Sequence, residues 1–194
     1  MTSTLGHAIL GLLARKPATG YDLARRMDRP VGWFWTARHS QIYPELARLE
    51  ADGLVEHEEI DGAGPRQSKR YAVTAHGTAT LADWVASDLE PQPVRDLEVL
   101  RLWSVWTVEP EAARDLVRRA RDQHAARLTA YEVELAEASA DPTSRDPRRP
   151  AFASRITLEG GVRNRRAAVE WCDWMLGELA DRADAPPEAE SGPA

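Results

Sequence analysis

The feature that most constrains this sequence is a change of hydrophobic period within its first 75 residues. Apolar residues first recur at helical spacing in three short stretches that are separated by turn residues. The pattern then changes to two strands that flank a segment rich in Gly, Asp and Pro. The expected elements are helices near 5–16, 21–28 and 37–52 and strands at 54–60 and 69–74.

Three helices followed by a two-stranded hairpin is the element order of a winged helix-turn-helix. In that arrangement the third helix faces outward and fits the DNA major groove, while the hairpin, or wing, touches the sugar-phosphate backbone. Ser and Gln side chains can bond base edges, and basic side chains can bind phosphate. We therefore expect double-stranded DNA as a partner. The candidate residues are Arg38, Ser40, Gln41 and Tyr43 on the third helix and Arg66, Lys69 and Arg70 on the hairpin.

Each of these residues also has a structural interpretation. Arg38 and Gln41 could be solvated helix surface, and Tyr43 could pack against the first helix. The net charge of −6 argues against a nucleic-acid partner, but it is unevenly distributed. Residues 1–75 hold ten Lys and Arg against nine Asp and Glu, so the acidity lies in the second half. What favours DNA binding is the joint placement of the candidates on two elements that would face DNA.

The rest of the chain is predicted to be helical. A fourth helix starts near Ala75 and continues through Leu89, before prolines break the pattern. The later helices are expected at 95–107, 110–140 and 151–182, with a proline-rich linker at 141–150. The predicted fold class is mainly α with a small two-stranded wing. The predicted domains are a DNA-binding domain at 1–90, a helical dimerisation and effector domain at 91–184, and a disordered tail at 185–194.

The composition indicates the cellular compartment in which the chain is expected to act. No stretch approaches the roughly 20 apolar residues of a membrane-spanning helix, so no membrane association is expected. The N-terminal apolar run lacks the basic start and clean cleavage site of a signal peptide. Cys172 is the only cysteine, which excludes an internal disulfide and a zinc knuckle built from thiolates. We expect a cytoplasmic protein.

Three groups of motifs run through the first 77 residues: Ala8–Leu13 with Pro17–Leu23, Ser40–Leu46 with Arg48–Val55, and Gly64–Arg66 with Lys69–Thr74 and Gly77. These motifs resemble those of the PadR family of transcriptional regulators. This resemblance implies DNA contacts at Ser40, Gln41, Tyr43 and the basic wing residues, and it places Tyr21 of the second helix near phosphate. It also implies repression as the usual activity, although the longer members include activators.

The second half carries two further motifs, Arg95-Asp96 with Leu100–Trp103, and Leu158–Arg163 with Glu170-Trp171. These motifs resemble the longer PadR-like subgroup, whose helical C-terminal domain is similar to that of virulence activators of the AphA type. Helices with apolar stripes must bury them against each other or against a second chain. The resemblance implies that these helices form a homodimer interface. A two-fold dimer would suit a palindromic operator whose half-sites are about 34–36 Å apart.

Seven tryptophans are many for 194 residues. Packing in the core and in a dimer interface is one explanation, because each tryptophan buries a large area. The other is a pocket for a flat aromatic effector between domains or subunits, which would shift the spacing of the two third helices. The candidate effector-binding residues are Trp33, Trp35, Trp103, Trp106, Trp171 and Trp174.

The sequence lacks the motifs of the main classes of enzyme and metal-binding protein. No phosphate-binding loop, nucleophile elbow or Cys–His pairing is present, so we expect neither an enzyme nor a cofactor. The histidines show no metal-ligand spacing, and no metal is expected. A winged-helix module that binds protein rather than DNA remains an alternative, because the net charge is negative. Loss of affinity with salt would distinguish DNA binding from that alternative.

Overall fold

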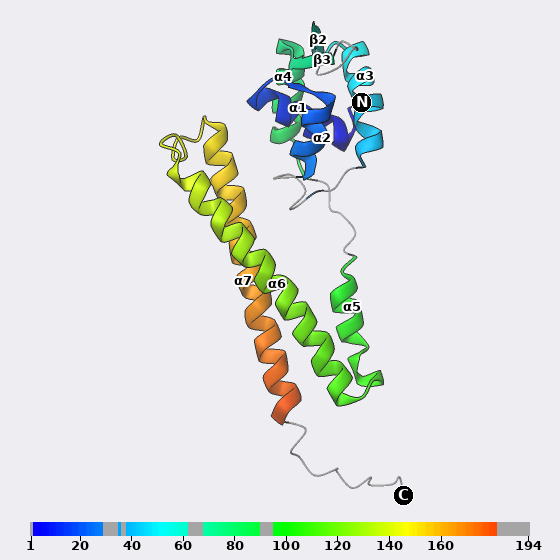
Figure 1. The fold of residues 1–194 in the computed structure, drawn as a ribbon, viewed down its shortest axis with the longest axis vertical. Coiled ribbons are helices and arrows are strands. Elements are labelled where there is room, and N and C mark those ends of the chain that lie inside the picture. Colours follow the sequence, from blue (N-terminus) through cyan, green and yellow to red (C-terminus); the bar gives the residue numbers. More distant parts are fainter. Residues whose placement is uncertain (1, 29–34, 36–37, 62–67, 90–94, 182–194) are drawn as a thin grey trace, which may run out of the picture. The chain divides into compact units, whose positions relative to one another are not determined.

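A computed structural model of the 194-residue chain describes residues 2–28, 35, 38–61, 68–89 and 95–181 (Figure 1). The chain forms two compact units, Met1–Pro91 and Gln92–Ala194. Helices dominate both units, and the N-terminal unit also holds a small antiparallel sheet. The predicted fold class, mainly α with a small wing, is therefore confirmed. The predicted tail at 185–194 lies outside the described residues.

The N-terminal unit follows the predicted order of elements. Ser3 caps the first helix by accepting from the Gly6 N–H, and Thr74 caps the fourth by accepting from the Gly77 N–H. The elements are α1 (Thr4–Arg15), β1 (Ala18–Thr19), α2 (Gly20–Asp28), η2 (His39–Gln41), α3 (Ile42–Ala51), β2 (Val55–Ile60), β3 (Ser68–Val73) and α4 (Ala75–Ala86).

The sheet has three strands in the order β1-β3-β2, with antiparallel pairing throughout. β2 and β3 form the expected wing. The third strand, β1, lies where the sequence predicts only a turn, and it pairs Ala18 with Tyr71. Two residues are too few to show the alternation by which a strand is recognised in sequence. This strand ties the connection between α1 and α2 to the wing.

Two predicted helix boundaries are wrong. The third helix is α-helical only from Ile42, because Pro44 lacks the N–H that would bond back to the Ser40 carbonyl. The preceding residues form the 3-10 turn η2 instead. The fourth helix ends at Ala86, where the Ser87 hydroxyl bonds the Trp84 carbonyl at 2.8 Å. Leu89 therefore lies beyond the helix and is exposed.

The core of the N-terminal unit lies among α1, α2, α3 and the sheet. Gly77 allows α4 to begin close to this core, since a Cβ there would lie 2.0 Å from the Leu54 carbonyl oxygen. The fully buried large side chains of this unit are Ile9, Leu10, Leu13, Leu23, Ile42, Leu46 and Leu49.

The C-terminal unit is built on a long helical hairpin. α6 (Pro110–Ala140) and α7 (Pro150–Asp181) run side by side in Figure 1, joined by turns at 141–149. Pro110 occupies the first helical turn of α6, where no backbone donor is lost. The Tyr131 ring lies against Gly161, where a Cβ would come within 3.1 Å of it.

The predicted helix at 95–107 is in fact two shorter elements, α5 (Leu97–Trp103) and η3 (Val105–Thr107). The break occurs at Ser104. Its carbonyl accepts from the Thr107 hydroxyl at 2.8 Å, and such side-chain bonds compete with helical backbone bonds. Among the described residues, no helix has both the length and the apolar character needed to cross a membrane.

Candidate nucleic-acid interface

One face of α3 is fixed in the core and the other is exposed. Ile42, Leu46 and Leu49 are buried at helical spacing, so the opposite face must point away from the core. Tyr43, about a quarter turn round the helix from the buried face, is 59% exposed. The sequence prediction of an outward-facing third helix thus agrees with the burial of its residues.

A buried carboxylate fastens α3 to the start of α1. The Ser3 hydroxyl donates to Glu45 Oε1 at 2.6 Å, and the Arg48 guanidinium lies 3.3 Å from Glu45 Oε2. A Cβ at Gly6 would lie 2.7 Å from the same carboxylate, so a larger residue there would force the carboxylate to shift. These contacts fix the rotation of α3 about its own axis and thereby decide which residues it exposes.

The turn before α3 brings three of the candidates together. Arg38, Ser40 and Gln41 are all exposed. The Arg38 N–H donates to Gln41 Oε1 at 3.3 Å, and the Gln41 N–H donates to the Arg38 carbonyl at 2.9 Å. The Gln41 amide oxygen therefore has a role in closing this turn, which its position in the sequence does not reveal.

Tyr43 also links α3 to α2. Its ring lies on Gly20, where a Cβ would be 2.5 Å from Tyr43 Cε1. Tyr21, the next residue of α2, is exposed. Thr19 caps this helix: its hydroxyl donates to Asp22 Oδ2 at 2.9 Å and accepts from the Asp22 N–H. Hydrogen bonds from the Thr19 hydroxyl and N–H lower the pKa of the Asp22 carboxyl.

One residue of this face was missed by the sequence prediction. Arg48 is exposed on α3 and helps to line a hollow of about 510 Å³ between the starts of α1 and α3. Its spacing from Gln41 and Pro44 repeats the 3–4-residue period of a helix face, so it could have been found from the sequence. The other residues around the hollow are Ser3, Thr4, Leu5, Ser40, Gln41, Pro44 and Glu45.

The wing is less basic than its candidate residues suggest. Lys69 and Arg70 are exposed on β3, but the register places them opposite Glu59 and Glu58 of β2. Arg70 forms an ion pair with Glu58 at 3.2 Å. The exposed surface of the described hairpin therefore carries mixed charge. Arg66, the third basic candidate, lies outside the described residues.

The candidate effector residues are divided between the units. Trp33 lies outside the described residues, and Trp35 packs against the N-terminal core. In the C-terminal unit, Trp103 and Trp106 are 81% and 82% exposed. Trp171 and Trp174 on α7 are also exposed. The tryptophans of the C-terminal unit are therefore not core residues of the single chain.

Comparison with known protein families covers most of the chain. Residues 9–83 match the transcriptional regulator PadR-like family. Residues 94–180 match the virulence activator alpha C-terminal family. The two matches follow the two compact units, and they agree with both resemblances inferred from the motifs.

Individual relatives extend over nearly the whole chain. A probable transcriptional regulator of Mycobacterium tuberculosis is 32% identical over 189 residues, which cover 92% of this chain and 98% of the relative. The negative transcriptional regulator PadR of Bacillus subtilis is 30% identical over 178 residues, which cover 90% of this chain and 97% of the relative.

Solved structures show the same fold. Bacillus subtilis PadR in complex with operator DNA superposes with a TM-score of 0.83 and 28% identity, covering 91% of this chain and 99% of that one. The same protein in complex with p-coumaric acid superposes with a TM-score of 0.76 and 26% identity, covering 91% of this chain and 95% of that one. The Vibrio cholerae virulence activator AphA superposes with a TM-score of 0.68 and 27% identity, covering 92% of this chain and 99% of that one.

Proposed function

The chain belongs to the PadR-like family of transcriptional regulators, and we propose that it is a repressor that binds a palindromic operator as a homodimer. Its relatives are regulators and not enzymes, which agrees with the absence of catalytic motifs. DNA binding would place its action in the cytoplasm. A relative with 28% identity over 91% of this chain was solved with operator DNA.

The observation that carries the proposal is the exposed start of α3. Ser40 and Gln41 offer hydroxyl and amide groups that can bond base edges, and both precede a helix fixed by the core. Arg38 and Tyr43 flank them and suit phosphate or sugar contacts. We assign base recognition to Ser40 and Gln41, and positioning on the backbone to Arg38 and Tyr43.

Phosphate contacts would come from elements on either side of α3. Tyr21 is exposed at the start of α2, beside the Gly20 position that the Tyr43 ring covers. Lys69, Arg70 and Arg66 would supply the wing contacts. Because Arg70 is paired with Glu58, we expect Lys69 to contribute more than Arg70 to the salt dependence of binding.

Homodimerisation would follow from the apolar surface of the C-terminal unit. Leu97, Leu100, Trp103 and Trp106 are exposed on α5 and η3 within a stretch of ten residues. Large exposed apolar patches of this kind mark interaction sites. A second copy would cover them and would place two α3 helices for two half-sites.

A small aromatic effector is the finer part of the proposal. A relative with 26% identity was solved with p-coumaric acid, a planar phenolic acid. In this chain Trp103, Trp106, Trp171 and Trp174 offer exposed indole surfaces in one unit. We expect tryptophan fluorescence to be quenched by a planar phenolic ligand. No change across a panel of such compounds would contradict this part.

The test is DNA binding measured against salt, using the DNA upstream of the protein's own gene. The affinity should fall steeply with salt, because phosphate contacts release counterions. Tyr43→Ala should weaken binding, and Tyr43→Phe should keep the ring on Gly20 and separate packing from the hydroxyl contact. Lys69→Ala should reduce the slope of log binding constant against log salt concentration by about one. Arg148→Ala, in the turn of the C-terminal unit, should leave that slope unchanged.

One observation favours a second function, a winged-helix module that binds protein. Glu56, Glu58 and Glu59 give β2 an acidic exposed edge, which would repel phosphate. That function predicts no DNA affinity even at low salt, for any DNA tested. A regulator that activates instead of repressing would bind DNA with the same salt dependence and would differ only in a transcription assay.

A further inference from the structure

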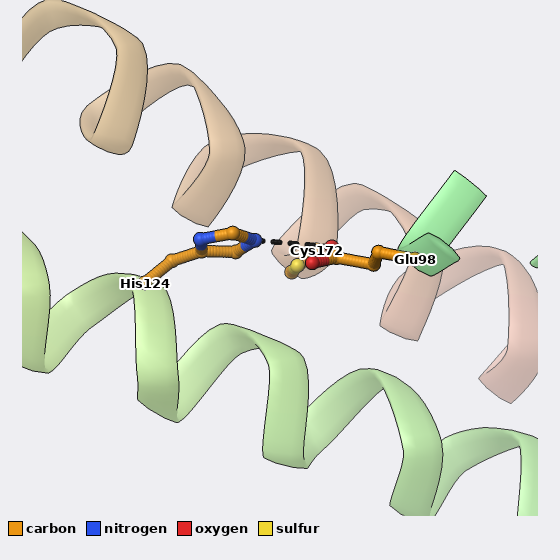
Figure 2. A group of neighbouring side chains, drawn as sticks. All are labelled: Glu98, His124 and Cys172. Carbon is orange, nitrogen blue, oxygen red and sulfur yellow. Dashed lines mark hydrogen bonds and ion pairs between the residues drawn. The ribbon is translucent and has the colours of Figure 1, made fainter. Parts of the chain in front are cut away.

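Three side chains with metal-binding atoms converge in the C-terminal unit (Figure 2). Glu98 comes from α5, His124 from α6 and Cys172 from α7. One potential ligand atom from each lies within 4.8 Å of the other two. Cys172 is fully buried, while His124 and Glu98 are partly buried. Their distance in sequence explains why spacing predicted no metal site.

We propose that Glu98, His124 and Cys172 form a binding site for a divalent transition-metal ion of the Zn²⁺ type. A thiolate, an imidazole and a carboxylate are the three ligand types that zinc binds in proteins. Hard ions such as Mg²⁺ and Ca²⁺ prefer oxygen ligands and would not use the sulfur. Three protein ligands would leave one position of a tetrahedral ion for water.

The hydrogen bonds show which proton the ion would replace. Arg165 Nη1 lies 3.0 Å from His124 Nδ1, and because a guanidinium can only donate, Nδ1 must accept. Nε2 then carries the proton and donates to Glu98 Oε1 at 3.0 Å. A metal ion bound between His124 Nε2 and Glu98 would take the place of that proton.

Arg165 therefore opposes the metal-bound state. A neutral imidazole that binds metal through Nε2 carries its proton on Nδ1, and that N–H usually donates to an acceptor. Arg165 has no acceptor to offer, so it must move away when the ion binds. A glutamine at this position could accept from Nδ1 through its amide oxygen, so Arg165→Gln should strengthen metal binding.

Binding would also displace the thiol proton. A metal ion binds the thiolate form of a cysteine and not the thiol. Burial raises the pKa of the Cys172 thiol, with a further contribution from the negative charge of Glu98. The ion would form a bond to sulfur and release one proton per ion, and affinity would rise with pH. The charged groups around this thiol are Glu98, Asp173 and Arg121, and Arg165 lies on the far side of His124.

A bound ion would add a direct link among α5, α6 and α7, beyond the hydrogen bond from His124 to Glu98 that already joins α6 to α5. α5 contributes Glu98, and the same short helix carries Leu100 and Trp103 on its exposed surface. Coordination would fasten this helix to α6 and α7. Metal binding should therefore protect α5 from hydrogen exchange more than it protects α1 of the N-terminal unit.

The test is a Co²⁺ titration of the full chain, purified without a histidine tag, with Co²⁺ as the spectroscopic substitute for Zn²⁺. We expect one ion per chain, a thiolate-to-cobalt absorption band in the ultraviolet, and loss of that band when Zn²⁺ is added. Proton release of one per ion would be measured with a pH indicator. Absence of the band in the wild-type chain would overturn the proposal.

Variants separate this site from others. Cys172→Ser should abolish the band, and Glu98→Gln and His124→Gln should each weaken binding at least about tenfold. His76→Gln, at an exposed position on α4, is the matched control and should bind like the wild type. A band that persists in Cys172→Ser, or unchanged affinity in both Glu98→Gln and Arg165→Gln, would contradict the proposal. Glu98 and Arg165 are only partly buried, so their variants test the site even if Cys172→Ser misfolds.

Discussion

The two units of this chain bury their apolar residues very differently. The N-terminal unit encloses the core cluster, with large residues from α1, α2 and α3 that are inaccessible to solvent. The C-terminal unit has longer helices, yet its buried residues are few and spaced apart along α6 and α7. Its largest side chains, including Trp103, Trp106 and Trp174, are exposed instead.

This difference teaches what each unit needs. A unit that closes its own core can hold α3 at a fixed rotation without help from a second chain. A helical hairpin with exposed tryptophans leaves apolar surface that another surface must cover. The chain thus combines a self-sufficient surface proposed to bind DNA with a unit proposed to join two copies.

The largest expected effect comes from truncating a buried leucine of the N-terminal unit, and an exposed leucine of the C-terminal unit serves as the comparison. Leu46→Ala removes a side chain that is 0% exposed and should lower the free energy of unfolding by about 2–5 kcal/mol. Leu100→Ala removes one that is 60% exposed and should change the free energy of unfolding of its own C-terminal unit by less than about 0.5 kcal/mol. Denaturant unfolding monitored by circular dichroism measures both. Equal losses of stability in Leu46→Ala and Leu100→Ala would contradict the difference in burial between the two units.

The next effect concerns close packing at Gly77. An alanine Cβ there would meet the Leu54 carbonyl oxygen at 2.0 Å. Gly77→Ala should therefore lower the free energy of unfolding by about 1–3 kcal/mol or more. Gly160→Ala in α7 meets nothing within 4 Å and should instead stabilise by about 0.5–1 kcal/mol, because alanine favours a helix. Thermal unfolding of the two variants gives the sign of each change. A neutral Gly77→Ala would mean that α4 begins farther from the sheet.

The third prediction sharpens the role of the exposed tryptophans. Trp103→Ala should leave the fold intact but raise the dimer dissociation constant by at least about tenfold, as expected for an aromatic residue central to an interface. Sedimentation velocity over a range of concentrations would detect the shift. A variant that dimerises like the wild type would remove Trp103 from the proposed interface.

The smallest effect is a pH dependence within the N-terminal unit. His7 stacks on Trp84 with ring centroids 4.5 Å apart, and burial lowers the pKa of its imidazole below the usual 6.5. The unfolded chain then binds a proton at a higher pH than the folded chain. The contribution of His7 to the free energy of unfolding should therefore be fully present above pH 6.5, and it should decrease as the pH falls from there through the lowered pKa.

His7→Phe keeps a ring against Trp84 and removes the titration. Its stability should depend less on pH than that of the wild type in the same range, measured by urea unfolding. Asp22 titrates in a separate, more acidic range, because its pKa is lowered from 3.8 and its stabilisation is lost as the pH falls further. An identical pH profile for both proteins would exclude His7 as the cause.

Most of the fold could be predicted from the sequence, because the elements are marked by strong local signals. α6 begins at Pro110 and ends at Ala140, as the apolar stripe and the prolines predict. The errors occur where short polar side chains or a single proline decide the backbone, as at Ser104, Ser87 and Pro44. Periodicity averages over a window and does not resolve these one-residue effects.

The candidate site was predictable only in part. Helical spacing identifies the exposed start of α3, but not the contact of Ser3 with Glu45 that fixes its rotation, because those residues lie far apart in sequence. Counting charges likewise could not show that Arg70 is paired with Glu58. Such facts depend on register and tertiary packing. The roles of the individual residues in DNA binding stay predictions.

The central claim is that one chain offers one DNA-binding surface and that two chains are joined by their C-terminal units. Its most direct test is the mass of the protein–DNA complex, measured by sedimentation with DNA from upstream of the protein's own gene. We predict two chains per operator for the wild type and no complex at the same concentration for Tyr43→Ala, which should still be a dimer. A complex with a single chain, or undiminished binding by Tyr43→Ala, would contradict the account.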